Sequence, residues 1–149
     1  WNIGWGSWGE YLPYYENKVT LDKNKKDKWG LPALHIDCEF KENEKKMRID
    51  MRNSAAEMLE TAGIKNVSTY DNMPAPGFCI HEMGTARMGK DPKTSVLNKW
   101  NQMHEAKNVF ITDGSAMASS ACQNPSLTYM ALTARAADFA VTELKKGNL

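Results

Sequence analysis

The stretch NVFITDGSAMASSACQNPSL, residues 108–127, carries the clearest structural signals in the chain. Its first residues form a short apolar run that closes on Asp113-Gly114, which is typical of a β-strand followed by a turn. Small and polar residues follow, and Asn124-Pro125 then precedes a long alanine-rich segment. Because Asn is favoured at a helix N-cap and Pro at the first helical position, we expect a strand over 108–113, a loop, and a helix that opens at Asn124-Pro125.

The alanine-rich segment predicts the last helix of the chain. Its apolar residues recur at helical spacing and form one stripe: Leu127, Met130, Ala131, Ala134, Ala137, Val141 and Leu144. Lys145 and Lys146 lie near the expected C-terminal end, where positive charge is favoured. Gly147 is suited to end the helix.

The region before this helix predicts a mixture of strands and helix. Residues 18–21 and 34–40 favour two short strands, and the second alternates loosely between apolar and polar side chains. The lysine-rich stretch between them, residues 23–28, is expected to be a solvated loop. The fold class that follows is α+β.

A longer helix is expected after the second strand. Met and Ala residues recur at spacings of three and four over residues 43–62, and Gly63 is well placed to end the helix. Residues 64–70 favour a further short strand, and Pro74 and Pro76 then interrupt the chain.

Composition excludes several classes of protein. The 149 residues are 42% hydrophobic and 25% charged, as in an ordinary globular protein, so disorder is not the expected state. The formal net charge of +1 argues against a nucleic-acid partner, which usually requires a basic excess. No apolar run approaches the ~20 residues of a membrane span. The chain starts at Trp1, so we expect its length to be that of a piece of a longer protein.

Two familiar motifs are present only in part. Residues 4–9, GWGSWG, match G-x-G-x-x-G but lack the preceding strand and following helix that a dinucleotide site needs. His81-Glu82 begins like H-E-x-x-H, but Thr85 stands where the second histidine would be, so a zinc site is not expected. Three dispersed cysteines, without C-x-x-C, also support no metal or redox motif.

The remaining polar features suggest one ligand site built from separate loops. His81 opens a stretch of small residues, 84–89, where a backbone can approach a ligand closely. Asp113-Gly114-Ser115 follows a strand end, and the helix start at Asn124 offers free N–H groups and a positive dipole end. Taken singly, each feature is better explained by an ordinary turn, cap or hydrogen-bonded histidine.

Taken together, these segments resemble the C-terminal region of the glucose–methanol–choline (GMC) flavoprotein oxidoreductases. The matching pieces are HEMGTARMG at 81–89, VFITDGS at 109–115 and NPSLT at 124–128, with the alanine-rich helix after them. The resemblance is strongest over 78–145, and the wording of residues 84–96 is most similar to the sugar and sugar-acid dehydrogenase branch.

This resemblance implies a fold divided between two domains. Residues 10–77 would belong to the antiparallel sheet and packed helices of a substrate domain, and 78–107 to the segment of the catalytic histidine. Residues 108–149 would supply the final strand and C-terminal helix of an FAD-binding domain. The dinucleotide-binding unit of the family would lie in an N-terminal portion, so we expect this chain alone to bind FAD weakly or not at all.

The resemblance also implies residue roles in hydride transfer from a substrate alcohol to flavin N5. His81 would accept or orient the hydroxyl proton, which suits a side chain that titrates near neutral pH. Asn124 would hydrogen-bond the substrate oxygen. The helix start at Asn124, Pro125 and Ser126 would face the flavin edge, and Asp113 and Gly114 would approach the ribityl–pyrophosphate part of FAD. No metal is implied.

The partners implied are a sugar or polyol substrate, the N-terminal FAD-binding portion, and a cytochrome or quinone as electron acceptor. Neither nucleic acid nor a membrane span in this chain is implied. For the compartment, two alternatives stay open, the bacterial periplasm and the cytoplasm, and the resemblance favours the periplasm. The alternatives are an oxygen-using oxidase of the same family, an inactive fragment, and a non-enzymatic binding module.

Overall fold

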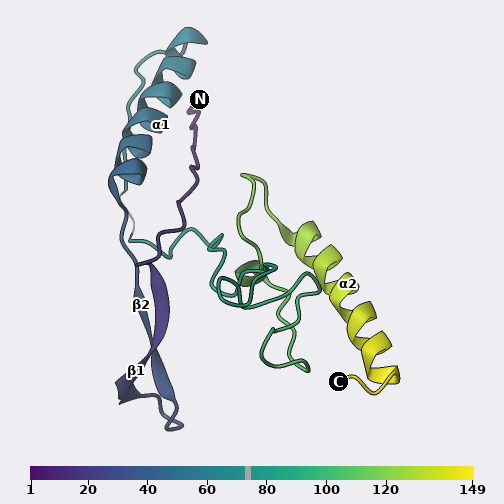
Figure 1. Cartoon of the computed structure of the whole chain (residues 1–149). Coiled ribbons are helices and arrows are strands. Elements are labelled where there is room, and N and C mark those ends of the chain that lie inside the picture. The colour runs from purple at the N-terminus through teal and green to yellow at the C-terminus, as the bar shows by residue number, and fades with distance from the viewer. Residues whose placement is uncertain (73–74) are drawn as a thin grey trace. The chain divides into compact units, whose positions relative to one another are not determined.

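The computed structural model describes residues 1–72 and 75–149 and divides into two compact units (Figure 1). The first unit is Trp1–Phe78 and the second is Cys79–Leu149. Pro74, which we expected to interrupt the chain, lies outside the described residues. The described elements are a two-stranded sheet and two long helices, which is compatible with part of an α+β protein.

The first unit contains an antiparallel hairpin of β1, Lys18–Lys26, and β2, Pro32–Asp37. Both predicted strands are therefore present, but the second lies at Pro32–Asp37 instead of 34–40. The lysine-rich stretch is not simply a loop, because β1 continues through it to Lys26 after an irregularity in the register that begins at Asp22. The turn is closed by Asp27, whose carboxylate accepts hydrogen bonds from the backbone N–H groups of Trp29 and Leu31.

The long helix of this unit, α1, spans Glu42–Thr61, close to the predicted bounds. At its end Gly63 has φ +83°, and two hydrogen bonds, Gly63 N–H to Glu60 and Ile64 N–H to Leu59, close the last turn. The strand predicted over 64–70 is wrong. Ile64 completes this helix end, and Asn66, with φ +56°, is in a left-handed conformation that a strand does not accommodate.

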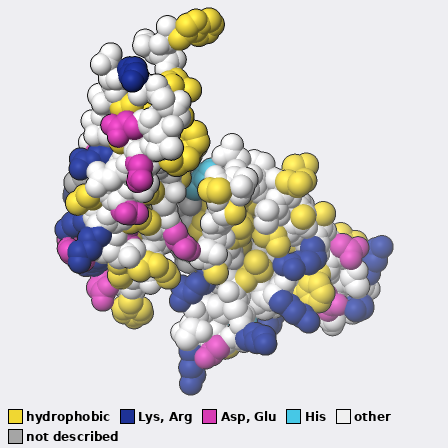
Figure 2. Space-filling model, turned by 90° about the horizontal axis from the view of Figure 1, so that it is seen from above, with side chains coloured by type: hydrophobic (Ala, Val, Ile, Leu, Met, Phe, Trp, Pro, Cys, Tyr) yellow, Lys and Arg dark blue, Asp and Glu magenta, His cyan; other side chains and the backbone are white. Residues whose placement is uncertain are grey.

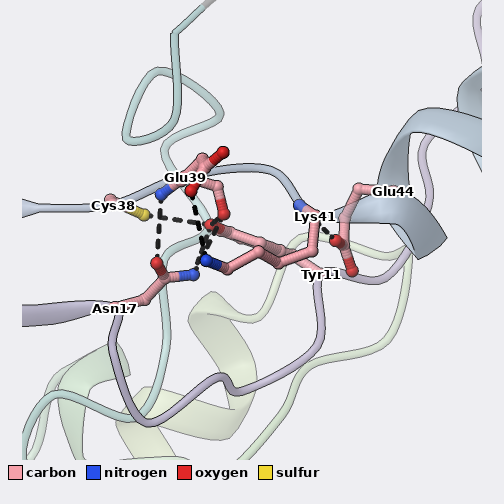
Figure 3. A network of polar contacts seen from close by, with 6 residues as sticks. All are labelled: Tyr11, Asn17, Cys38, Glu39, Lys41 and Glu44. Atoms are coloured by element: carbon pink, nitrogen blue, oxygen red, sulfur yellow. Dashed lines mark hydrogen bonds and ion pairs between the residues drawn. The ribbon is translucent and has the colours of Figure 1, made fainter.

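A polar network ties the segment before β1 to the segment between β2 and α1 (Figure 3). The Tyr11 hydroxyl donates to the carbonyl of Glu39 over 2.6 Å and accepts from Asn17 Nδ2 over 2.6 Å. Asn17 Oδ1 accepts from the N–H of Glu39 over 3.0 Å, and Cys38 Sγ lies 3.1 Å from the Tyr11 oxygen. Burial, followed by the contact with Cys38, raises the pKa of Tyr11, so this hydroxyl stays protonated and able to donate.

Glu44 is the buried anchor beside this network, with only 2% of its surface exposed. Its Oε1 lies within 3.3 Å of three donors, which are Leu12 N, Tyr14 Oη and Asn43 Nδ2. Its Oε2 accepts from the backbone N–H of Lys41 over 3.0 Å. Burial by itself raises the pKa of Glu44, but these hydrogen bonds outweigh burial and hold the pKa below its ordinary value of 4.5.

The depressed pKa of Glu44 predicts an acid-sensitive first unit. A carboxylate whose pKa is lower in the folded state stabilises the fold above its unfolded pKa, and this contribution is lost as pH falls through the folded value. The free energy of unfolding should therefore hold near pH 6 and fall below about pH 4.5. Urea titrations followed by circular dichroism across this range test the expectation. A Glu44→Gln variant, which cannot ionise at this position, should show a shallower acid loss.

The second unit contains a short 3₁₀ turn, Gly114–Ala116, and the helix α2, Ser126–Lys145. Residues 108–113, predicted as a strand, form none. Phe110 makes an isolated bridge with Gln102, and Met103 N–H and Ile111 N–H bond to Val109 and Asn101. A regular strand needs a neighbour along its whole length, and among the described residues this segment finds only these single pairings.

The centre of the second unit is small and partly polar. Leu97 and Ala116 are fully buried, and so is Asn101, whose φ is +61°. The Asn101 side chain donates to the carbonyl of Ile111 over 2.9 Å and accepts from Arg135 of α2 over 3.1 Å. On the same helix Phe139 stacks on Trp100 with ring centroids 4.8 Å apart. These contacts attach α2 to the loop region before it.

The face of α2 that packs inward is not the predicted stripe. Ala136 is buried, and Tyr129, Leu132 and Phe139 are half-buried. By contrast, Leu127, Met130, Val141 and Leu144 of the predicted stripe are 50–78% exposed. Figure 2 shows hydrophobic side chains on the visible surface of the molecule. The alanine-rich helix is apolar on more than one face, so its periodicity alone did not select the face that packs.

Within the described part of the chain, neither helix has the length and apolar character needed to cross a bilayer.

Candidate functional site

His81 lies in a tight loop at the start of the second unit. The preceding residue, Ile80, has φ +61°, which reverses the chain, and the backbone N–H of His81 approaches Cys79 Sγ to 3.4 Å. The loop is closed by Glu82, whose Oε1 accepts the backbone N–H of Cys79 over 3.0 Å. The His81 side chain is half-buried, and its imidazole hydrogen-bonds no group in the described residues. Its nitrogens are therefore available to a ligand.

The small residues after His81 bring this segment onto the 3₁₀ turn. Ala86 N–H bonds to the Ser115 carbonyl and Met88 N–H to the Ala116 carbonyl, each over 2.9 Å. A Cβ built at Gly114 would lie 2.9 Å from Met83 Sδ. The absence of a side chain at Gly114 therefore permits this close approach.

Gly84 makes the turn between His81 and these contacts. Its φ of +88° lies in the left-handed region, which costs an L-residue about 1–2 kcal/mol. Gly84→Ala should therefore lower the free energy of unfolding of the second unit by about this amount. Urea unfolding measures the loss. Gly4→Ala, where a Cβ meets nothing within 4 Å, is the matched control and should be neutral. Equal stability of the two variants would contradict the assignment.

Asp113 has a local structural task. Its carboxylate accepts the backbone N–H of Ser115 over 2.9 Å and also the Ser115 hydroxyl, and so caps the 3₁₀ turn. The predicted turn at Asp113-Gly114 is therefore present, with Asp113 as its first residue. This arrangement fixes the orientation of the turn that contacts the His81 segment.

The start of α2 differs from the prediction by one position. Pro125, not Asn124, occupies the N-cap, and Ser126 is the first helical residue. No side chain caps this end, and the first turn contains no acidic residue. Asn124 and Ser126 are exposed, whereas Pro125 is buried. The first-turn N–H groups of α2 thus retain the partial positive charge of a helix N-terminus.

Tyr129 links this helix start to the His81 segment. Its hydroxyl lies 3.7 Å from Met83 Sδ, and a Cβ at Gly114 would come within 2.8 Å of the same hydroxyl. The three sequence segments are therefore joined at one point by Met83, Gly114 and Tyr129. Among the described residues, the side chains of His81 and Asn124 form no hydrogen bond with each other.

The sequence reasoning missed Glu82 and Tyr129. Glu82 entered it as part of an incomplete zinc motif and of the family segment at 81–89, without a role, and Tyr129 lies outside the apolar stripe predicted for the helix. The described residues contain no cluster of three or more His, Cys, Asp or Glu side chains placed to hold an ion.

Comparison with known families identifies what these joined segments are. The family model described as GMC oxidoreductase matches residues 13–133, which is most of the chain. The chain belongs to the GMC oxidoreductase family. The resemblance read from the three segments is thereby confirmed, and GMC oxidoreductases generally use FAD.

Individual relatives of this GMC chain include dehydrogenases and oxidases. It is 40% identical over 134 residues to 2-methyl-1,2-propanediol dehydrogenase of Mycolicibacterium austroafricanum, covering 88% of this chain and 24% of that protein. It is 32% identical to the fructose dehydrogenase large subunit of Gluconobacter japonicus, covering 93% and 25%. It is 34% identical to paromamine 6'-oxidase of Streptomyces fradiae, covering 84% and 23%. The chain spans about a quarter of the length of these relatives.

Proposed function

We propose that the chain is the C-terminal catalytic portion of an FAD-dependent dehydrogenase that oxidises an alcohol, with a sugar, glycoside or sugar acid as the substrate class. The observation that carries this proposal is the junction of the His81 segment, the Asp113-Gly114 turn and the start of α2 at Met83, Gly114 and Tyr129. The half-buried imidazole, which has no hydrogen-bond partner among the described residues, thus lies on the same scaffold as an uncapped helix N-terminus.

The residues present are suited to a flavin. The first turn of α2, without a side-chain cap or an acidic residue, offers N–H donors and positive potential to an electronegative ring edge. Asn124, Pro125 and Ser126 would form this contact, and the turn at Asp113 and Gly114 would lie against the ribityl–pyrophosphate part. FAD, when bound, supplies the acceptor for the hydride that leaves the substrate carbon.

The roles of the protein residues follow from the chemistry of alcohol oxidation. Loss of a hydride from the carbon and a proton from the hydroxyl turns an alcohol into a carbonyl. In this proposal a neutral imidazole nitrogen of His81 accepts the hydroxyl proton, and the Asn124 side chain donates a hydrogen bond to the substrate oxygen. The Asn124 amide cannot act as a base near neutral pH, so the proton transfer is assigned to His81 alone.

An oxidase is the second candidate, because several relatives, paromamine 6'-oxidase among them, bear the name of an oxidase. For the dehydrogenase, the proposed electron acceptor is a cytochrome or quinone, and the proposed compartment is the bacterial periplasm. The FAD-loaded enzyme that contains this chain should lose its yellow flavin colour when mixed anaerobically with its sugar substrate. Reoxidation by a dye without peroxide formation would support a dehydrogenase, whereas stoichiometric peroxide in air would support the oxidase. Absence of bleaching by any sugar or small diol would contradict both.

A further inference from the structure

The loop that carries His81 holds a backbone conformation that needs support. Ile80 is β-branched and has φ +61°, a left-handed backbone region in which such residues are rare. A strained residue persists only where surrounding contacts over-determine its conformation. The contacts around this loop therefore indicate what holds the backbone that carries His81 in place.

One side chain closes the loop directly. Glu82 Oε1 accepts the backbone N–H of Cys79 over 3.0 Å and so spans both Ile80 and His81. A second contact within the loop, from His81 N–H to Cys79 Sγ at 3.4 Å, involves a weak sulfur acceptor. The Glu82 carbonyl lies beside Gly114, since a Cβ built there would come 3.4 Å from it.

The Glu82 carboxylate is ionised under ordinary conditions. Partial burial raises its pKa, but the hydrogen bonds from Cys79, together with its own backbone N–H, bring the net pKa below 4.5. A charged acceptor makes a stronger hydrogen bond to a backbone N–H than a neutral one. The hydrogen bond from the Cys79 N–H to the Glu82 carboxylate is therefore present at the pH where alcohol oxidation would run.

We infer that Glu82 is a positioning residue for His81: its carboxylate, bonded to the Cys79 N–H, sets the loop conformation that aims the imidazole at the substrate hydroxyl. The inference rests on the proposed function, since it assumes that His81 takes the substrate proton. Glu82 itself does not touch substrate in this assignment. Its effect reaches the reaction only through the geometry of residues 79–82.

The kinetic test compares three variants of the FAD-loaded enzyme. Glu82→Ala should lower kcat for substrate-driven flavin reduction about 10- to 100-fold, because a misplaced base loses near-attack geometry. KM should change little. Glu82→Gln should recover most of the loss, since its amide oxygen can accept the same Cys79 N–H. Glu105→Ala, an exposed carboxylate of the same unit, is the matched control and should leave kcat unchanged.

A second readout does not depend on activity. In the 149-residue chain, amide hydrogen exchange at Cys79 should quicken in Glu82→Ala, return toward the parent rate in Glu82→Gln and stay unchanged in Glu105→Ala. If His81→Ala leaves flavin reduction intact, the proposed function itself fails. If His81→Ala abolishes reduction while Glu82→Ala retains full kcat, only the positioning role fails. Equal loss in Glu82→Ala and Glu82→Gln, without faster exchange at Cys79, would also overturn it.

Discussion

His81→Ala should slow flavin reduction by the alcohol substrate about 10²- to 10⁴-fold in the FAD-loaded enzyme, the range that a positioned general base contributes. The reason is structural as well as chemical. The His81 imidazole has no hydrogen-bond partner in the described residues, so its nitrogens are not already committed to holding the fold. Stopped-flow measurement of flavin bleaching under anaerobic conditions isolates this step from reoxidation by the electron acceptor.

The matched control for this prediction is His35→Ala. His35 is exposed on β2 in the first unit, outside the joined segments, and its loss should leave the rate of flavin reduction unchanged. Added imidazole should partly restore the rate of His81→Ala, because a small base can occupy the space that the truncation opens. A His81→Ala enzyme that reduces its flavin at the parent rate would remove His81 from the mechanism.

Glu44→Ala should lower the free energy of unfolding of the first unit by about 3 kcal/mol, as expected when a buried, charged acceptor is removed from several part-buried donors. The side chain gathers hydrogen-bond donors from Leu12, Tyr14, Lys41 and Asn43, and almost none of its surface is exposed. Removing it leaves backbone and side-chain donors without a partner and frees the start of α1 from the preceding segment.

The control for this stability prediction lies on the same helix. Glu57 is exposed on α1, so Glu57→Ala should change the free energy of unfolding by less than about 0.5 kcal/mol. Urea titration followed by far-ultraviolet circular dichroism gives both values. The Glu44 variant should also show faster amide exchange at Leu12 and Lys41. Equal stability of the Glu44 and Glu57 variants would show that the buried carboxylate does not anchor this region.

The sequence predicted those elements whose signals are local. Helix α1 is delimited by a periodic stripe and by Gly63, and the presence of two hairpin strands, though not their exact ends, follows from two short strand-like runs with turn residues between them. These signals act within a few residues, so they can be recognised without knowledge of distant contacts. The family resemblance likewise depended on three short segments whose order and spacing are visible in the chain itself.

Other features depend on partners distant in sequence. Residues 108–113 have the composition of a strand, but strand formation requires a neighbour, and the described residues supply only single pairings. The packed face of α2 is selected by Trp100 and Asn101, which contact Phe139 and Arg135 from more than thirty positions away. Glu82 was overlooked because the role of a loop carboxylate depends on which backbone N–H it reaches.

The hairpin of β1 and β2 has a consequence for handling this polypeptide. Its cross-strand pairs Val19–Ile36 and Leu21–Leu34 are all exposed, and both outer strand edges lack a neighbouring strand in the described residues. Such a ribbon is a template for edge-to-edge aggregation. The lysines clustered at 23–28 lie on the same hairpin, where repulsion between like charges opposes stacking of identical copies. High salt, by screening them, should favour precipitation during purification.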